Sequence, residues 1–198
     1  MDLTELQLDA LREMANIGSG NAATALAAML GRPVDLSVPS AAALPLADAV
    51  EAVGDVDELI TAVGIPVVGD LGATVLLTFQ PEAAATLCGF LGAAGDPEME
   101  LSALQEIGNI LGSAYISAMG SMCGLELEPA PPQAASDMLG AIVASVLAPV
   151  AAYSDVALLL DSAMIVEDSE CRFGFLFVPD EEGVATVLGR LGLWGQAA

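Results

Sequence analysis

Two stretches, Asp9-Ala-Leu-Arg-Glu13-Met-Ala-Asn16 and Ser102-Ala-Leu-Gln-Glu106-Ile-Gly-Asn109, repeat one pattern on which the rest of the chain is built. Each has an acid or a hydroxyl, then three residues, Glu, two residues and Asn. A proline follows each Asn after 22 further residues, at Pro39 and Pro132. Every matched position is 93 residues from its counterpart (102 − 9, 106 − 13, 109 − 16 and 132 − 39). Packing a core does not require a polar Asn at the same place twice, so the repeat needs a chemical explanation as well as a structural one.

The first half predicts a helix, a strand, a hairpin and a second helix. Thr4 is a suitable N-cap, and apolar residues at helical spacing continue to Gly31. Gly18, inside this run, either breaks the helix or lets another backbone approach closely, and so does Gly20. The predicted elements are helix Thr4–Gly31, strand Val34–Val38 stopped by Pro39, strands Leu59–Val68 and Ala73–Phe79, and helix Pro81–Leu91. Residues 40–58 are harder to place, and Val50–Val53 in them could form a strand.

The second half replays this plan after a linker, Gly95-Asp96-Pro97-Glu98. Its predicted elements are helix Ser102–Met122, helix Met138–Leu147 capped by Ser136 or Asp137, strands Val156–Val166 and Arg172–Val178 around the turn Glu167–Glu170, and helix Glu181–Leu193. The offset grows to 98 at Asp168 (168 − 70) and at Pro179 (179 − 81). We therefore expect one α/β domain over residues 1–198, with pseudo-two-fold half-repeats at about 1–97 and 98–198. Long helices should pack on a mainly antiparallel β-sheet.

The charge balance excludes some partners. The 198 residues are 55% apolar and 16% charged, with 4 basic against 27 acidic side chains and a net charge of −23. Nucleic acid is excluded because so few cations cannot displace phosphate counterions. Anionic membrane surfaces are disfavoured for the same reason. The chain has no His, the usual residue of metal sites and catalytic triads.

Targeting signals and cysteines point to the cytoplasm. The N-terminus lacks the basic and apolar regions of a signal peptide. The uncharged run Leu139–Tyr153 has 15 residues and contains Pro149, whereas a membrane-spanning helix needs about 20, so we interpret it as buried. Three widely spaced cysteines in apolar settings indicate buried free thiols in a reducing compartment: Cys88, Cys123 and Cys171.

The repeated motif places a carboxylate beside a carboxamide on one helix face. Residues three and four positions apart are neighbours on a helix, which groups Asp9 with Glu13 and Asn16, and likewise groups Ser102, Glu106 and Asn109. Such a pair offers a charge that can hold a partner's cation and an amide that can orient water. It offers no nucleophile and no metal cage.

Structural readings of the same residues stay open. A lone Glu13 or Glu106 is usually a solvated helix acid, and Asn16-Ile17-Gly18 could end a helix. Asp9 and Ser102 could be supports or caps, and Pro39 and Pro132 could be strand terminators that place a loop. The joint recurrence at fixed spacing is what favours function.

The doubled pattern resembles the active-site signature of the CheC/CheX/FliY phosphatases of bacterial and archaeal chemotaxis. The resemblance covers nearly the whole chain, and it implies hydrolysis of the aspartyl phosphate of a CheY-type response regulator in two-component signalling. By motif position, Glu13 and Glu106 would pair with the regulator's lysine, and Asn16 and Asn109 would orient the attacking water. It also implies that the chain has no cofactor of its own and that Mg²⁺ belongs to the regulator.

The resemblance also bears on partners. The segment Asp137–Leu147 resembles the part of CheC that contacts the receptor deamidase CheD, although a buried core helix explains it equally well. Two intact motifs favour a CheC-like chain, and we expect a monomer without membrane insertion. Two alternatives are a non-catalytic module that docks a regulator or a CheD-like protein, and a purely structural α/β protein.

Overall fold

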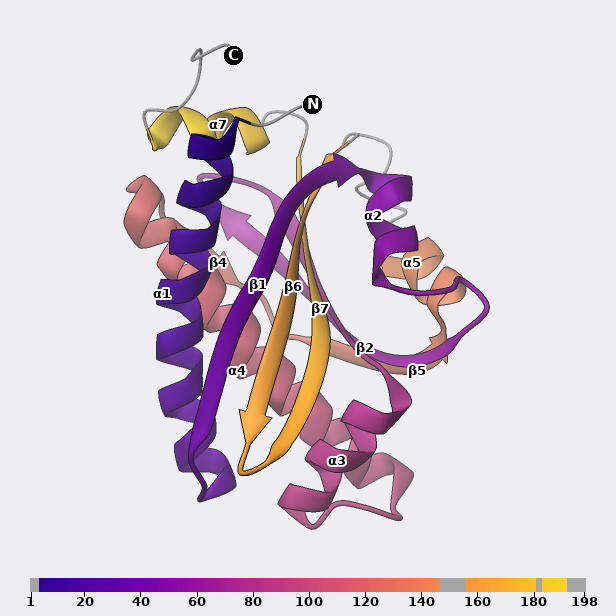
Figure 1. The fold of residues 1–198 in the computed structure, drawn as a ribbon. Helices are drawn as coiled ribbons and strands as arrows, with labels where there is room; N and C mark the ends of the chain where they lie inside the picture. Colours follow the sequence, from indigo (N-terminus) through magenta and orange to yellow (C-terminus); the bar gives the residue numbers. More distant parts are fainter. Residues whose placement is uncertain (1–3, 147–155, 181–182, 192–198) are drawn as a thin grey trace.

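Two long helices carry the repeated stretches, and both pack against a curled antiparallel sheet (Figure 1). This computed structural model describes residues 4–146, 156–180 and 183–191. The helices are α1 (Glu5–Leu30), α2 (Leu46–Val53), α3 (Pro81–Leu91), α4 (Pro97–Cys123), α5 (Leu139–Val146) and α7 (Gly183–Arg190). The strands are β1 (Val34–Pro45), β2 (Leu59–Gly69), β3 (Ala73–Phe79), β4 (Leu127–Pro129), β5 (Gln133–Met138), β6 (Val156–Val166) and β7 (Ser169–Pro179).

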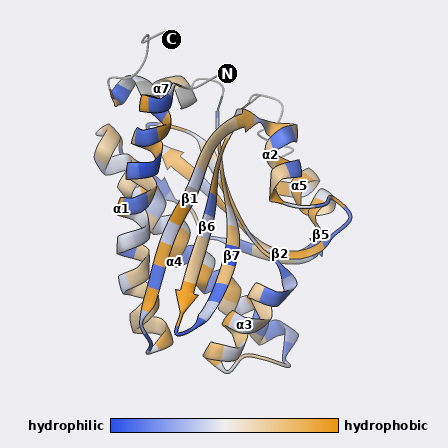
Figure 2. Ribbon diagram, viewed as in Figure 1, coloured by the Kyte–Doolittle hydropathy of each residue, from blue (hydrophilic) through white to orange (hydrophobic). Residues whose placement is uncertain are grey.

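The sheet separates two hydrophobic cores because successive side chains of a strand point to opposite faces. In β7, Phe173, Phe175 and Phe177 belong to the core beneath α1, α3 and α4. Leu176 and Val178 of the same strand belong to the core beneath α2 and α5. Figure 2 shows hydrophobic colouring along the strands and hydrophilic residues concentrated in the N-terminal half of α1. The first of the two motifs lies in that half.

The sheet reveals the two-fold relation between the halves. Its strand order is β1-β6-β7-β3-β2-β4, with β5 also pairing with β2, and the described pairs are antiparallel. At its centre Leu77 of β3 lies opposite Phe175 of β7, and these residues are 98 apart (175 − 77), the offset of this part of the repeat. A residue that pairs with its own repeat equivalent marks a two-fold axis. The predicted fold class is therefore confirmed.

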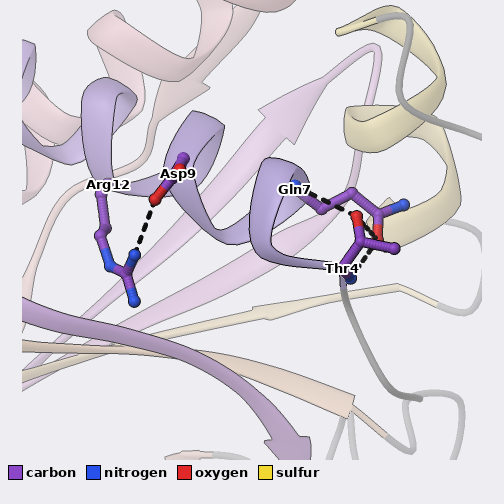
Figure 3. Close-up of polar contacts among 4 residues, drawn as sticks. All are labelled: Thr4, Gln7, Asp9 and Arg12. Carbon is purple, nitrogen blue, oxygen red and sulfur yellow. Dashed lines mark hydrogen bonds and ion pairs between the residues drawn. The ribbon is translucent and has the colours of Figure 1, made fainter. Parts of the chain in front are cut away.

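The ends of α1 and α4 follow from local sequence. The Thr4 hydroxyl accepts a hydrogen bond from the Gln7 N–H at 3.4 Å, and Gln7 Oε1 accepts one from the Thr4 N–H at 2.7 Å, which together form a capping box (Figure 3). Asp96 caps α4 by accepting from two N–H groups of its first turn. Both helices end at a glycine with left-handed backbone, Gly31 and Gly124, again 93 residues apart (124 − 31).

The two motif prolines mark irregular edges of the sheet. β1 does not stop at Pro39, as the sequence predicts, but continues to Pro45 with a shift in register between Ser37 and Ser40. The equivalent edge of the other half is interrupted at residues 130–132, between β4 and β5, and Pro132 lies in this interruption. Proline lacks the N–H that a strand ladder needs, so it is tolerated at edges and bulges. Pro39 thus lies within an edge strand, and Pro132 lies in a break between two short strands.

Other element boundaries need correction. Val50–Val53, which the sequence left as a possible strand, belongs to α2, where apolar residues recur at helical rather than alternating spacing. α4 begins at Pro97 instead of Ser102, because Asp96 caps it and proline suits the first helical position. Ser136 and Asp137, predicted as caps of a helix, belong instead to β5, which covers residues 133–138 and runs directly into α5. Leu147, the predicted last residue of one helix, lies outside the described residues. So do Glu181 and Leu193, the predicted first and last residues of another.

The two predicted hairpins and the predicted state of the cysteines are confirmed. The hairpin of β2 and β3 and that of β6 and β7 form as expected. The three cysteines are buried and free, and burial raises the pKa of each thiol. Within the described ranges, no helix is both long enough and apolar enough to span a membrane.

Candidate functional site: two acid and amide surfaces

The first motif lies on the solvent face of α1. Leu11, Met14 and Ala15 are buried against the core, which turns Glu13 and Asn16 outward, and both are exposed. Neither side chain makes a hydrogen bond or ion pair with the described residues. α1 continues unbroken to Leu30, so the alternative that Asn16-Ile17-Gly18 ends a helix is wrong. The carboxylate and the carboxamide are therefore both available to a partner.

Asp9, the third polar residue of this motif, is held by a neighbour. Its Oδ1 accepts a hydrogen bond from Nη1 of Arg12 at 2.7 Å, as Figure 3 shows. The two side chains are 66% and 37% exposed, and an ion pair this exposed contributes little stability. Asp9 is not the helix cap, since Thr4 has that role. The pair neutralises the cation nearest to Glu13.

The second motif lies on α4 in the same order but less openly. Ser102 and Glu106 are exposed, whereas Asn109 is half-buried. Asn109 Oδ1 accepts a long hydrogen bond, 3.5 Å, from the hydroxyl of Ser113. Ser102 is five residues inside the helix and is not its cap. At the place equivalent to Ser113, α1 has Gly20, so nothing comparable holds Asn16.

The position of the motifs is set where α1 and α4 cross in antiparallel directions (Figure 1). A Cβ placed on Gly18 would lie 3.0 Å from Cα of Tyr115, so the backbones touch there. Glu13 lies five residues before Gly18, and Glu106 lies nine residues before Tyr115. At 1.5 Å per residue the two motifs are about 20 Å apart along the helices. Each motif therefore has its own end of a shared outer surface.

The crossing contains a buried hydrogen bond. The hydroxyls of Ser19 and Tyr115 are 2.8 Å apart, and Ser19 is only 2% exposed. Burial raises the pKa of the Tyr115 hydroxyl, and the bond with Ser19 acts in the opposite direction. This contact joins residues 96 positions apart in the chain. It fixes the relative placement of the two motif helices.

The chain has few cations, and most of them are paired. The four basic residues are all arginines, and Arg12, Arg32 and Arg172 each form an ion pair with a carboxylate. A cavity of about 530 Å³, lined in part by Gln80 and Arg172, lies away from both motifs. Exposed groups on helix surfaces suit contact with another protein better than enclosure of a small molecule.

The structure adds polar and apolar residues that the sequence argument missed. Ser113 contacts Asn109, and Leu6 and Met99 are exposed apolar residues on the motif helices. Leu6 and Met99 are also 93 residues apart (99 − 6), so extending the repeat comparison two helical turns towards the N-terminus would have found them.

Comparison with known proteins places these surfaces in context. The model of the CheC-like family matches residues 6–42 and 99–136. CheY-P phosphatase CheC of Bacillus subtilis (strain 168) is 30% identical over 200 residues, which cover 96% of this chain and 96% of that protein. Flagellar motor switch phosphatase FliY of the same organism is 30% identical over 139 residues, covering 67% of this chain and 36% of that one.

Solved structures share the fold at lower identity. Thermotoga maritima FliY matches with a TM-score of 0.79 and 19% identity, over 97% of this chain and 98% of that one. A chain of the CheX-CheY-BeF3-Mg²⁺ complex from Borrelia burgdorferi matches with a TM-score of 0.51 and 15% identity, over 85% of this chain and 97% of that one.

Proposed function

This chain belongs to the CheC-like family, and from that membership we propose that it is a chemotaxis phosphatase acting on the aspartyl phosphate of a CheY-type response regulator. The observation that supports this most strongly is the Glu and Asn pair repeated on two long helices, where every one of these side chains except the half-buried Asn109 is exposed. The name of the Bacillus subtilis relative, a CheY-P phosphatase, supports the reaction, and the CheX-CheY complex supports a regulator as partner.

In the proposed reaction Asn16 or Asn109 positions a water molecule. The carboxamide oxygen accepts a hydrogen bond from the water, whose oxygen forms a new bond to phosphorus. The bond between phosphorus and the aspartate oxygen breaks, its electron pair stays on the carboxylate, and the proton leaves with inorganic phosphate. Phosphoryl transfer depends mainly on positioning and electrostatics, so an uncharged amide suffices. An amide also brings no negative charge to the phosphoryl group.

Glu13 and Glu106 have a recognition role in this proposal. Each is exposed one turn before its Asn, where it can form an ion pair with a lysine of the regulator. A helix holds the two side chains at constant spacing, so docking of the carboxylate brings the amide to the phosphoryl group. The regulator would supply Mg²⁺ for its own phosphoryl group, and this chain would add no cofactor.

The proposal extends to setting and partners. We expect a cytoplasmic monomer, with the acidic surface favouring basic partner surfaces over nucleic acid. A CheD-like deamidase remains a second partner to test at the segment beginning at Asp137. The competing function is a binding module in which the same two surfaces dock the regulator without hydrolysis.

The test compares the lifetime of a phosphorylated regulator with and without the protein. The CheY-type regulator of the same organism is phosphorylated with acetyl phosphate, excess donor is removed, and phosphate loss is followed. Wild-type protein should shorten the lifetime, Asn16→Ala and Asn109→Ala should each retain part of the effect, and the double variant should lose it. Asn21→Ala is the control, because Asn21 is exposed on α1 outside the motif.

Two results would contradict the enzyme. An unchanged lifetime with excess wild-type protein that still binds the regulator would favour the binding module. Full acceleration by the doubly substituted protein would place the chemistry somewhere other than these amides.

A further inference from the structure

Two exposed apolar side chains occupy equivalent places beside the two motifs. Leu6 in α1 is 54% exposed, and Met99 in α4 is 52% exposed. Their separation of 93 residues (99 − 6) is the offset of the motifs. A single exposed apolar residue is ordinary on a protein surface. The same degree of exposure at the same repeat position, beside the same polar pair, is a property of the site.

Helix geometry puts each of these residues in line with its motif. Leu6 precedes Glu13 by seven residues, and Met99 precedes Glu106 by seven. Seven residues are within about 20° of two full turns, so each apolar side chain lies on the same face as its Glu. The rise over seven residues is about 10 Å. A partner that grips the Glu therefore covers the apolar residue as well.

The other exposed apolar residue of these helices supports the same surface. Within the described parts of α1 and α4, the large hydrophobic residues that are exposed are Leu6, Ile17 and Met99. Ile17 is 41% exposed, four residues after Glu13 and adjacent to Asn16. All three thus lie within about 40° of a motif Glu around the helix axis. The exposed large hydrophobic residues of the two helices therefore all lie on the face that carries the motif.

We propose that Leu6 and Met99 are docking residues for the response regulator, each providing an apolar contact about two helical turns from the Glu of its motif. The inference rests on the proposed function, because the regulator is the partner that meets this face. Glu5 and Glu98 flank the apolar residues, so the complementary surface has an apolar patch with a basic rim.

The contact predicts an effect on binding rather than on turnover. Side chains that are half exposed in the free protein become buried on docking, which contributes to affinity but not to the position of the water. Removing one such contact should raise KM for the phosphorylated regulator about five-fold and change kcat by less than about two-fold.

The experiment isolates each surface in the full chain. Leu6→Gln is made in the Asn109→Ala background, and Met99→Gln in the Asn16→Ala background. Glutamine keeps the length and helix propensity but removes the apolar contact. The control is Val68→Thr, which makes a similarly exposed apolar residue (52%) polar at constant shape on β2. Both kcat and KM are measured with the regulator after its phosphorylation by acetyl phosphate. The affinity of each variant for the regulator is measured separately by calorimetry.

The outcomes separate this inference from the proposed function. A rise in KM and a matching loss of affinity for both glutamine variants, with Val68→Thr unchanged, would support the docking residues. If the glutamine variants bind the regulator as tightly as the Asn109→Ala and Asn16→Ala proteins in which they are made, Leu6 and Met99 are not docking residues, even if hydrolysis proceeds. If wild-type protein binds the regulator without hydrolysing its phosphate and the glutamine variants bind more weakly, the docking inference stands and the phosphatase falls. Failure of wild-type protein to bind the regulator would overturn both.

Discussion

Two glycines in α1 have opposite surroundings although both were predicted to break the helix or admit another backbone. A Cβ on Gly18 would lie 2.6 Å from Cδ1 of Tyr115 and 3.0 Å from its Cα, distances at which atoms must move. A Cβ on Gly20 would meet nothing within 4 Å. Gly18 therefore allows close helix packing, whereas Gly20 keeps the surface beside Asn16 open.

This difference predicts opposite effects of the same substitution. Gly18→Ala should lower the free energy of unfolding by about 1–3 kcal/mol, because the Tyr115 backbone cannot retreat without separating the helices. Gly20→Ala should leave stability unchanged or raise it by up to about 1 kcal/mol, since alanine favours the helix. Urea denaturation followed by circular dichroism measures both. Equal stability of the two variants would mean that α1 and α4 do not approach as closely as described.

The two Asn residues also differ, and the sequence alone does not show it. Asn16 is exposed and free of protein contacts, whereas Asn109 is half-buried and contacts the Ser113 hydroxyl. The motif letters are the same in both copies. The hydrogen bond is possible only on α4, because the residue four positions after the Asn is Ser113 there and Gly20 on α1. The difference in burial is a property of the folded structure.

At the scale of elements, the crossing of α1 and α4 sets the geometry of the whole site. Its polar centre is the hydrogen bond between Ser19 and Tyr115, 2.8 Å long and buried. A buried hydroxyl that loses its partner pays a desolvation penalty. The bond therefore favours one relative position of the helices.

A double-mutant cycle measures this coupling. Ser19→Ala and Tyr115→Phe should each lower the free energy of unfolding by about 1–3 kcal/mol, because each leaves a buried hydroxyl unsatisfied. The double variant should cost less than the sum of the two, by about 1 kcal/mol, because no orphan is left. Thermal or urea unfolding of the four proteins provides the values. Strictly additive losses would show that the two hydroxyls do not interact.

Element prediction failed where tertiary pairing outweighed local signals. Pro39 was expected to stop a strand, but β1 pairs with β6 on both sides of it, because an edge strand tolerates a missing N–H at a bulge. Ser136 or Asp137 was expected to cap a helix, yet pairing with β2 makes residues 133–138 a strand. By contrast, the hairpins, α1 and most of α4 were correct, since turn, capping and periodicity signals lie within a few residues of one another; only the start of α4 was placed too late.

For the whole molecule, net charge is the dominant electrostatic feature. The chain has a charge of −23 in 198 residues, and exposed ion pairs hold three of its four arginines. Folding brings these carboxylates closer together than in the unfolded chain, so self-repulsion opposes the native state. Exposed ion pairs contribute at most about 1 kcal/mol each and offset little of this.

Salt should therefore stabilise the protein. Raising NaCl from about 0.01 M to about 0.5 M shortens the Debye length from about 30 Å to under 10 Å. We expect Tm to rise by about 2–8 °C, equivalent to roughly 1–2 kcal/mol for a chain of this size. Calorimetric scans at several NaCl and KCl concentrations check this, with matching curves for the two salts as the control for specific ion effects. A falling Tm would show that local ion pairs outweigh the net repulsion.

The sequence by itself determined the duplicated halves, the two long helices, the hairpins and the identity of the motif residues, because periodicity, caps and turns are encoded locally and the repeat is visible in the letters. Only the tertiary structure decided that α1 and α4 cross at Gly18 and Tyr115, that Asn109 is less open than Asn16, and that Leu6 and Met99 stay exposed beside the motifs. The exposure of a side chain and the distance between two helices depend on contacts between residues about a hundred positions apart. No local pattern specifies which of the outward-facing residues another element will cover.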